Sequence, residues 1–200
     1  MKKHKAVFLD RDGTINVYKP DYLWKIEDFL WIPEAKEGLR ILSKTDYKIV
    51  IVSNQSGVGR GYYTKEDVER LHDWMLEECK KEGIRIDAIY YCPHHPDEGC
   101  LCRKPKPGMI HRAAEELVID LKKSWMIGDN PKDIEAGHAA GLKTIQVENR
   151  ELKAPDSPDP PVGGEDENPS VPTKEGTQEP HKSVKHLKDA VTHITRIKKL

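Results

Sequence analysis

The residues with the clearest chemical potential lie in the run FLDRDGT at positions 8–14, where two carboxylates, Asp10 and Asp12, follow an apolar stretch. Residues 5–9 are typical of a short buried strand, and Gly13 lets the chain turn sharply after it. Two acids held together repel each other, and a bound cation relieves that repulsion. A carboxylate can also act as a nucleophile while its neighbour acts as a general acid and base. A surface loop with two solvated acids is the alternative.

Two more apolar segments, residues 48–52 and 124–127, also end in polar residues, and a cationic pair lies between them in the chain. The ends of parallel strands are where ligands bind in open α/β sheets. Hydroxyl, amide and ammonium groups gathered there can hold the oxygens of a phosphate. The residues in question are Ser53, Asn54, Gln55, Arg103, Lys104, Asp129 and Asn130.

Three of the four cysteines and one histidine form a second pattern, Cys92-Pro-His94 followed by Cys100-Leu-Cys102. Three thiolates and one imidazole make a closed tetrahedral zinc site, which leaves no position for a reactive water. Reduced cysteines or a disulfide are the alternatives, although a disulfide leaves one of the three unused. Spacing alone does not separate His94 from His95 as the fourth ligand. Such a site would stiffen the loop that leads directly to the cationic pair.

Acid pair, hydroxyl, cation and acid occur in an order that resembles the haloacid dehalogenase superfamily of phosphohydrolases, and the resemblance spans most of residues 5–150. The strings DRDGTIN, SNQSGVGRGYYT and CPHHP…CLCRKPKPG are similar to those of bacterial D-glycero-D-manno-heptose 1,7-bisphosphate 7-phosphatases, a family of lipopolysaccharide heptose biosynthesis. The histidinol-phosphatase domain is a close relative with the same zinc quartet. The loop at 93–99 is short, as in histidinol phosphatases, so substrate and anomer stay open.

The resemblance implies a mechanism. Asp10 attacks phosphorus and forms an aspartyl-phosphate, while Asp12 protonates the leaving oxygen and then activates water. Ser53 and Lys104 bind the phosphoryl oxygens. Mg²⁺ is held by Asp10, the backbone carbonyl of Asp12, and Asp129, and the zinc ligand beside the cysteines is His94. The expected activity is removal of the 7-phosphate of the heptose bisphosphate.

Further residues are expected to bind the substrate, with Arg103 facing its second phosphate. The glycine cluster at 57–61 does not have nucleotide-binding spacing, so we interpret it as a substrate loop. Asp133 lies one turn into a predicted helix and either supports the site or only caps that helix. The expected substrate-binding residues are Tyr22, Asn54, Gln55, Arg60, Arg103 and Asn130.

Alternation of strands and helices predicts an α/β fold, a Rossmann-like, mostly parallel sheet flanked by helices, with a zinc-stabilised loop. No gap between motifs is long enough for a separate cap domain. Helices are expected at 33–45, 64–82, 107–117 and 131–140, and further strands at 84–91 and 142–147.

Three parts of the chain differ in composition: a phosphatase domain at 1–150, an acidic proline-rich linker at 153–180, and a C-terminal helix at 183–199. The linker holds few large apolar residues and is expected to be disordered. The helix carries Val184, Leu187, Val191 and Ile194 on one face. We expect that face to pack back on the domain while the basic residues stay solvated.

Composition excludes several function classes. The net charge of 200 residues is −1, so no overall field attracts nucleic acid or membrane. No apolar run is long enough to span a bilayer, and thiolate ligands imply a reducing compartment, so we expect a cytoplasmic protein. We also expect a monomer, and we expect its partner to be a phosphorylated sugar. A histidinol or other sugar phosphatase is the alternative function. A phospho-acceptor signalling domain is a further alternative. Asp12 argues against it, because a general acid and base beside the nucleophile promotes turnover, which a signalling domain must avoid.

Overall fold

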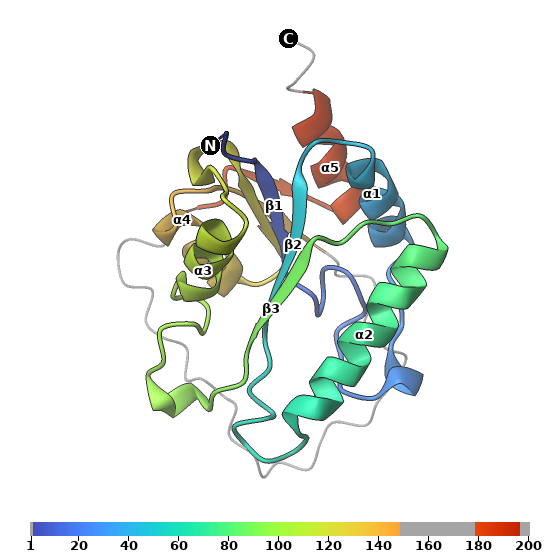
Figure 1. The fold of residues 1–200 in the computed structure, drawn as a ribbon, viewed down its shortest axis with the longest axis vertical. Coiled ribbons are helices and arrows are strands. Elements are labelled where there is room, and N and C mark those ends of the chain that lie inside the picture. Colours follow the sequence, from blue (N-terminus) through green and yellow to red (C-terminus); the bar gives the residue numbers. More distant parts are fainter. Residues whose placement is uncertain (1, 149–178, 197–200) are drawn as a thin grey trace.

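The computed structural model describes residues 2–148 and 179–196, and Figure 1 shows one sheet between two layers of helices. The six strands are all parallel and lie in the order β3-β2-β1-β4-β5-β6. They comprise β1 (Ala6–Leu9), β2 (Lys48–Asn54), β3 (Ala88–Cys92), β4 (Trp125–Gly128), β5 (Lys143–Val147) and β6 (Lys182–Val184). The helices are α1 (Pro33–Ser43), α2 (Lys65–Lys81), α3 (Gly108–Glu116), α4 (Pro131–Ala139) and α5 (Leu187–Arg196).

Each face of the sheet is covered by its own helices, which gives two cores. Helices α1, α2 and α5 cover one face, and α3 and α4 cover the other (Figure 1). Strand β1 lies in the middle and all four of its residues are fully buried, Val7 and Leu9 in one core and Ala6 and Phe8 in the other. Burial on both faces explains why the strands are continuous apolar runs in the sequence.

Capping residues determine where two of the helices begin. A capping box joins Thr64 and Asp67 at the start of α2. A second capping box joins Asn130 and Asp133 at the start of α4. Side-chain oxygens in these boxes accept hydrogen bonds from backbone N–H groups that the first helical turn leaves unpaired. Both helices therefore begin at a fixed residue, and α4 begins directly at the end of β4.

The C-terminal segment differs from the sequence-based expectation. Residues 182–184 form β6, which pairs in parallel with β5, so Val184 belongs to a strand and the helix begins only at Leu187. A three-residue spacing between Val184 and Leu187 fits a helical face, and the spacing does not reveal the intervening turn. Helix α5 lies against α1 so closely that a Cβ on Gly38 would be 3.1 Å from the backbone nitrogen of Lys188.

Two further features bear on the predicted organisation. The predicted linker at 153–180 lies outside the described residues except for its last two positions. Among the described helices, none is both long and apolar enough to cross a membrane.

Candidate active site

A cavity of about 620 Å³ lies at the carboxyl ends of β1, β2 and β4. This is the edge at which parallel α/β sheets bind ligands. Every residue predicted to act in catalysis or substrate binding lines it. These are Asp10, Asp12, Tyr22, Ser53, Asn54, Gln55, Arg60, Arg103, Lys104, Asp129 and Asn130. Asp133 lines the same cavity.

A buried lysine between two carboxylates forms the base of the cavity. The Nζ atom of Lys104 lies 2.7 Å from Asp10 Oδ1 and 2.6 Å from Asp133 Oδ1, and it also donates to the backbone carbonyl of Val52. Lys104 is only 3% exposed. Burial opposes its charge, yet Asp10 and Asp133 outweigh burial and raise the pKa of Lys104 above its usual value. The lysine is therefore a fixed positive charge beside Asp10.

Carboxylates outnumber this lysine, and their charge is not balanced within the site. Burial first, and then the charge of Asp133, raise the pKa of Asp10 well above its usual value, although Lys104 acts in the opposite direction. Burial and Asp133 also raise the pKa of Asp129 to about 6. Carboxylate oxygens of Asp10, Asp129 and Asp133 all lie within 4.8 Å of one another. Oxygen donors with unbalanced negative charge suit a hard divalent cation such as Mg²⁺.

Three side chains hold the carboxylate of Asp12. Arg11 donates from Nε and Nη2 to both carboxylate oxygens, with the shortest contact at 2.8 Å. Asn16 Nδ2 and Gln55 Nε2 each donate at 3.0 Å. Gln55 also donates to Ser53 Oγ at 2.8 Å, so it links the acid to the predicted phosphate-binding hydroxyl. Tyr63 in turn holds the amide oxygen of Gln55.

Asn54 makes a contact that its predicted role does not include. Its Oδ1 accepts from the backbone N–H of Lys104 at 3.0 Å, and its Nδ2 donates to the backbone carbonyl of the same residue at 3.1 Å. The amide thus joins the end of β2 to the segment that carries the lysine. Asn54 lines the cavity while its polar atoms are engaged in positioning Lys104.

The segment after β4 combines a helix start with the acidic part of the site. Asp129 Oδ1 accepts from Thr14 Oγ1 at 3.0 Å, and Gly13, at φ +84°, lies so close that a Cβ there would be 2.3 Å from Asp129 Oδ2. Asp133 makes a different contact with each of its two oxygens. Its Oδ2 caps α4 at the N–H of Asn130, and its Oδ1 contacts Lys104.

In the described part of the chain, four cationic side chains besides Lys104 also line the cavity. Lys19, Arg60, Arg103 and Lys132 all line it, and Lys19 pairs with Asp28 at 2.6 Å. The Nη1 atom of Arg103 is buried and has no hydrogen-bond partner among the described residues. Since an unpartnered buried guanidinium is costly, this atom is a ready donor to an anion in the cavity.

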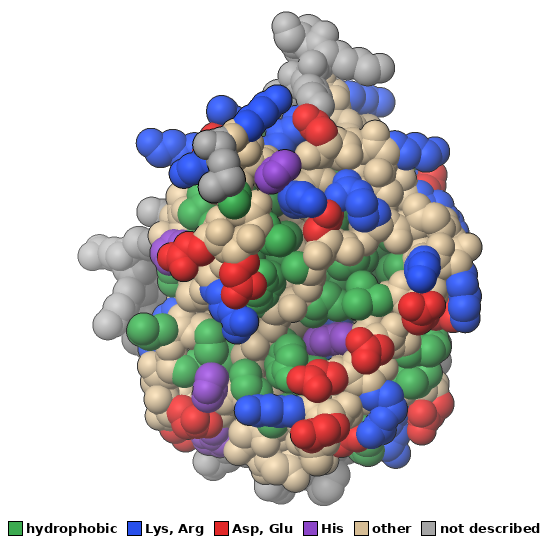
Figure 2. Space-filling view, in the orientation of Figure 1, with side chains coloured by type: hydrophobic (Ala, Val, Ile, Leu, Met, Phe, Trp, Pro, Cys, Tyr) green, Lys and Arg blue, Asp and Glu red, His purple; other side chains and the backbone are tan. Residues whose placement is uncertain are grey.

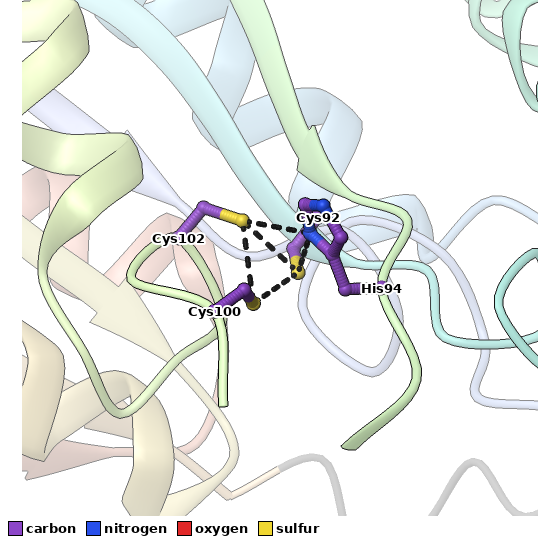
Figure 3. Close-up of side chains that lie close together, drawn as sticks. All are labelled: Cys92, His94, Cys100 and Cys102. Atoms are coloured by element: carbon purple, nitrogen blue, oxygen red, sulfur yellow. Dashed lines mark hydrogen bonds between the residues drawn. The ribbon is translucent and has the colours of Figure 1, made fainter. Parts of the chain in front are cut away.

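The four side chains of the predicted zinc quartet lie close together, as Figure 3 shows. Sulfur–sulfur distances among Cys92, Cys100 and Cys102 are 3.3–3.5 Å, and His94 Nδ1 lies 3.1 Å from the Sγ of Cys102 and 3.5 Å from that of Cys92. A tetrahedron with zinc–sulfur bonds of 2.3 Å has edges of about 3.8 Å. All three cysteines are free thiols. His95 Nδ1 accepts instead from the N–H of Asp97 and caps a 3₁₀ turn at residues 96–98, so the geometry favours His94 as the ligand.

Several residues that shape the site were not singled out from the sequence. They act through hydrogen bonds to residues of the site: Thr14 to Asp129, Asn16 to Asp12, and Tyr63 to Gln55. Arg11 is fully buried and contacts Asp12. The one available signal for Arg11 is its place between the two aspartates, since a charged residue there must face either water or a partner.

Comparisons with known proteins agree with this geometry. A D-glycero-alpha-D-manno-heptose-1,7-bisphosphate 7-phosphatase from Campylobacter jejuni is 47% identical over 154 residues, which are 77% of this chain and 88% of the relative. The chain belongs to the heptose 1,7-bisphosphate 7-phosphatase family of haloacid dehalogenase-type phosphatases. A beta-anomer member of this family, from Helicobacter pylori, is 44% identical over 78% of this chain and 91% of its own length.

The solved structures place the family in the same fold. A D,D-heptose 1,7-bisphosphate phosphatase from B. bronchiseptica, complexed with magnesium and phosphate, superposes with a TM-score of 0.79 and 28% identity, covering 96% of this chain and 99% of that chain. A family model described as HAD-hydrolase-like matches residues 101–163. The chain is therefore a phosphatase of the haloacid dehalogenase type, and the predicted fold class is confirmed.

Proposed function

We propose that this phosphatase removes the 7-phosphate of D-glycero-D-manno-heptose 1,7-bisphosphate in lipopolysaccharide heptose biosynthesis. The observation that carries the proposal is the arrangement of Asp10, Asp12 and Lys104 in a cavity that further cationic side chains also line. A bisphosphate presents two anionic groups, and these further cations could bind the group that does not react. The names of the relatives from Campylobacter jejuni and Helicobacter pylori support the same substrate.

The chemistry begins with Asp10, whose carboxylate attacks phosphorus in line and forms an aspartyl-phosphate. Asp12 donates a proton to the departing sugar oxygen and then takes a proton from the water that hydrolyses the intermediate. The hydroxyl of Ser53 and the ammonium group of Lys104 bind the phosphoryl oxygens, on which negative charge is redistributed in the transition state. Because Lys104 is buried beside Asp10, its positive charge lies close to the position that the phosphoryl group would occupy.

We propose that Asp10, Asp129 and the backbone carbonyl of Asp12 hold Mg²⁺. The charge of the ion would favour the ionised form of Asp10 and reduce the repulsion between that carboxylate and the incoming phosphate. Support comes from the raised pKa values of Asp10 and Asp129 and from the closeness of their oxygens. Asp133 is committed to Lys104 and to the cap of α4, so we assign it a supporting role.

Recognition of the rest of the substrate is assigned to other residues that line the cavity. We propose that Arg103 and Arg60 bind the second phosphate, since both line the cavity and one Arg103 nitrogen is buried without a partner. Asn130 and Tyr22 are assigned to the sugar. Gln55 and Asn54 line the same wall and are assigned mainly to holding Asp12 and Lys104.

A structural zinc ion is proposed for Cys92, His94, Cys100 and Cys102. The four ligand atoms leave no open position, so the ion would order the loop rather than activate water. Zinc-binding thiolates must stay reduced, which supports a cytoplasmic location.

Phosphate release from a panel of substrates tests the proposal. We expect high kcat/KM on one anomer of heptose 1,7-bisphosphate, release of one equivalent of phosphate, and little activity on histidinol phosphate. Preference for histidinol phosphate would instead favour the alternative that the short loop at 93–99 suggests. An Asp12→Asn variant should lose nearly all turnover, and unchanged turnover would contradict the assigned acid and base.

A further inference from the structure

A buried histidine on α2 lies behind Asp12. His72 is 5% exposed and lies on the inner face of the helix, where its Nε2 is 3.0 Å from Nη1 of Arg11. Arg11 is fully buried and donates from its other two nitrogens to the carboxylate of Asp12. The three side chains therefore form a continuous path from the helix to the cavity.

The direction of the hydrogen bond follows from the chemistry of the two groups. A guanidinium has only donors, so His72 Nε2 must accept and the ring proton must be on Nδ1. Burial, and after it the charge of Arg11, lower the pKa of His72 to about 3, so the ring is neutral near pH 7. An imidazole that stays neutral is a permanent acceptor for the guanidinium.

Two partners outside its own loop fix the plane of the Arg11 guanidinium. One is His72, and the other is the backbone carbonyl of Leu23, which accepts from Nη2 at 2.9 Å. Since the same guanidinium contacts both oxygens of Asp12, its orientation sets the orientation of that carboxylate.

We propose that His72 is a positioning residue for the acid-base carboxylate of Asp12 and acts on it through Arg11. The inference rests on the proposed function, in which Asp12 protonates the departing oxygen. Proton donation requires the carboxyl group within hydrogen-bond reach of that oxygen, and a displacement of about 1 Å can cost up to a hundredfold in rate. Loss of the acceptor at His72 would leave a buried N–H of Arg11 unpaired and allow the guanidinium to move.

Two variants separate this role from simple stabilisation. His72→Phe keeps a ring but removes the acceptor, whereas His72→Gln keeps an acceptor at about the position of Nε2. The readout is the ratio of kcat/KM for the heptose bisphosphate to kcat/KM for p-nitrophenyl phosphate. Nitrophenolate leaves without a proton, and kcat/KM includes the steps up to departure of the leaving group. A general loss of folded protein lowers both values equally.

We expect His72→Phe to lower this ratio about tenfold, in the range that general acid catalysis contributes, while His72→Gln restores it. Met75→Ala is the matched control, because Met75 is buried on the same face of α2 and its loss should lower stability without changing the ratio. If the phenylalanine variant does not fold, His72→Leu removes the acceptor with a smaller side chain.

An unchanged ratio in folded His72→Phe, or an equal fall in the glutamine variant, would overturn the positioning role. Wild-type protein inactive on both compounds would overturn the proposed function and this inference together. The two failures are therefore distinguishable.

Discussion

Asn54 holds the backbone of Lys104 from both sides, through an accepted hydrogen bond of 3.0 Å and a donated one of 3.1 Å. Cys102, a member of the zinc quartet, lies two residues before this lysine. The backbone of this lysine is thus held by the end of β2, and it follows directly on the proposed zinc loop. Its position depends on contacts with distant residues rather than on any helix or strand of its own.

Substitution Asn54→Leu should therefore lower kcat while leaving the substrate-binding arginines in place. Two hydrogen bonds of about 1 kcal/mol each correspond to a fall of roughly thirtyfold. Steady-state kinetics on the preferred substrate measures this fall in kcat. The matched variant is Asn54→Asp, which keeps only the acceptor and should have a kcat between those of the wild type and of Asn54→Leu. A change confined to KM would contradict the positioning role of Asn54.

Loss of zinc should unfold the loop at 93–102 before it unfolds the sheet. His94→Ala should bind less than one zinc per chain and lose thermal stability and activity together, because closed zinc sites contribute folding energy directly. Elemental analysis and thermal unfolding provide the measurements. The adjacent His95→Ala variant is the control and should retain its zinc, since His95 caps a turn instead. Equal zinc loss in both variants would leave His94 without its assigned role.

Gly13→Ala should impair metal binding more than folding. Both a left-handed φ of +84° and a Cβ position 2.3 Å from Asp129 Oδ2 oppose the change. Gly83→Ala isolates the first effect, because Gly83 has φ +68° but nothing within 4 Å of its Cβ position. We expect the Gly83 variant to lose about 1 kcal/mol of stability with full activity, and the Gly13 variant to bind Mg²⁺ weakly at any temperature at which it is folded. Normal Mg²⁺ affinity in folded Gly13→Ala would contradict the idea that the close approach of Gly13 to Asp129 keeps the metal site in place.

Affinity for Mg²⁺ should fall steeply in mild acid. Burial and Asp133 raise the pKa of Asp129 to about 6 in the metal-free protein, so below that pH a proton must leave before the ion binds. For one such proton the dissociation constant rises about tenfold per pH unit. Calorimetric titration between pH 5 and 8 measures this dependence. Asp129→Asn should make the dependence shallower and remove most of the affinity, while Asp10, whose pKa is also raised, still titrates.

The same shift has a consequence for stability in the absence of metal. A carboxyl group whose pKa is raised in the folded state binds more protons there than in the unfolded chain, so its contribution falls as pH rises through about 6. Metal-free protein should therefore gain stability from Asp129 as the pH is lowered from 7 to 5. The Asp129→Asn variant, compared by denaturant unfolding at both values, should lack that gain.

Local patterns in the sequence account for most of the fold, because buried parallel strands such as Ala6–Leu9 are short apolar runs and the capping box at Thr64 is a local motif. The site residues of each strand end could be predicted for the same reason. What the sequence could not reveal is pairing over long separations. Asn54 contacts a residue fifty positions later, and Arg11 meets a histidine sixty-one positions later. Neither contact leaves a periodic signal.

Asp133 carries out two tasks with its two oxygens, one at the start of α4 and one at the ammonium group of Lys104. In a library of variants selected only for folding, position 133 should tolerate almost as few residues as in a library selected for activity. Tolerance to mutation at this position would then not show whether folding or catalysis requires the aspartate. Only a variant that keeps one oxygen contact and loses the other could separate the two requirements.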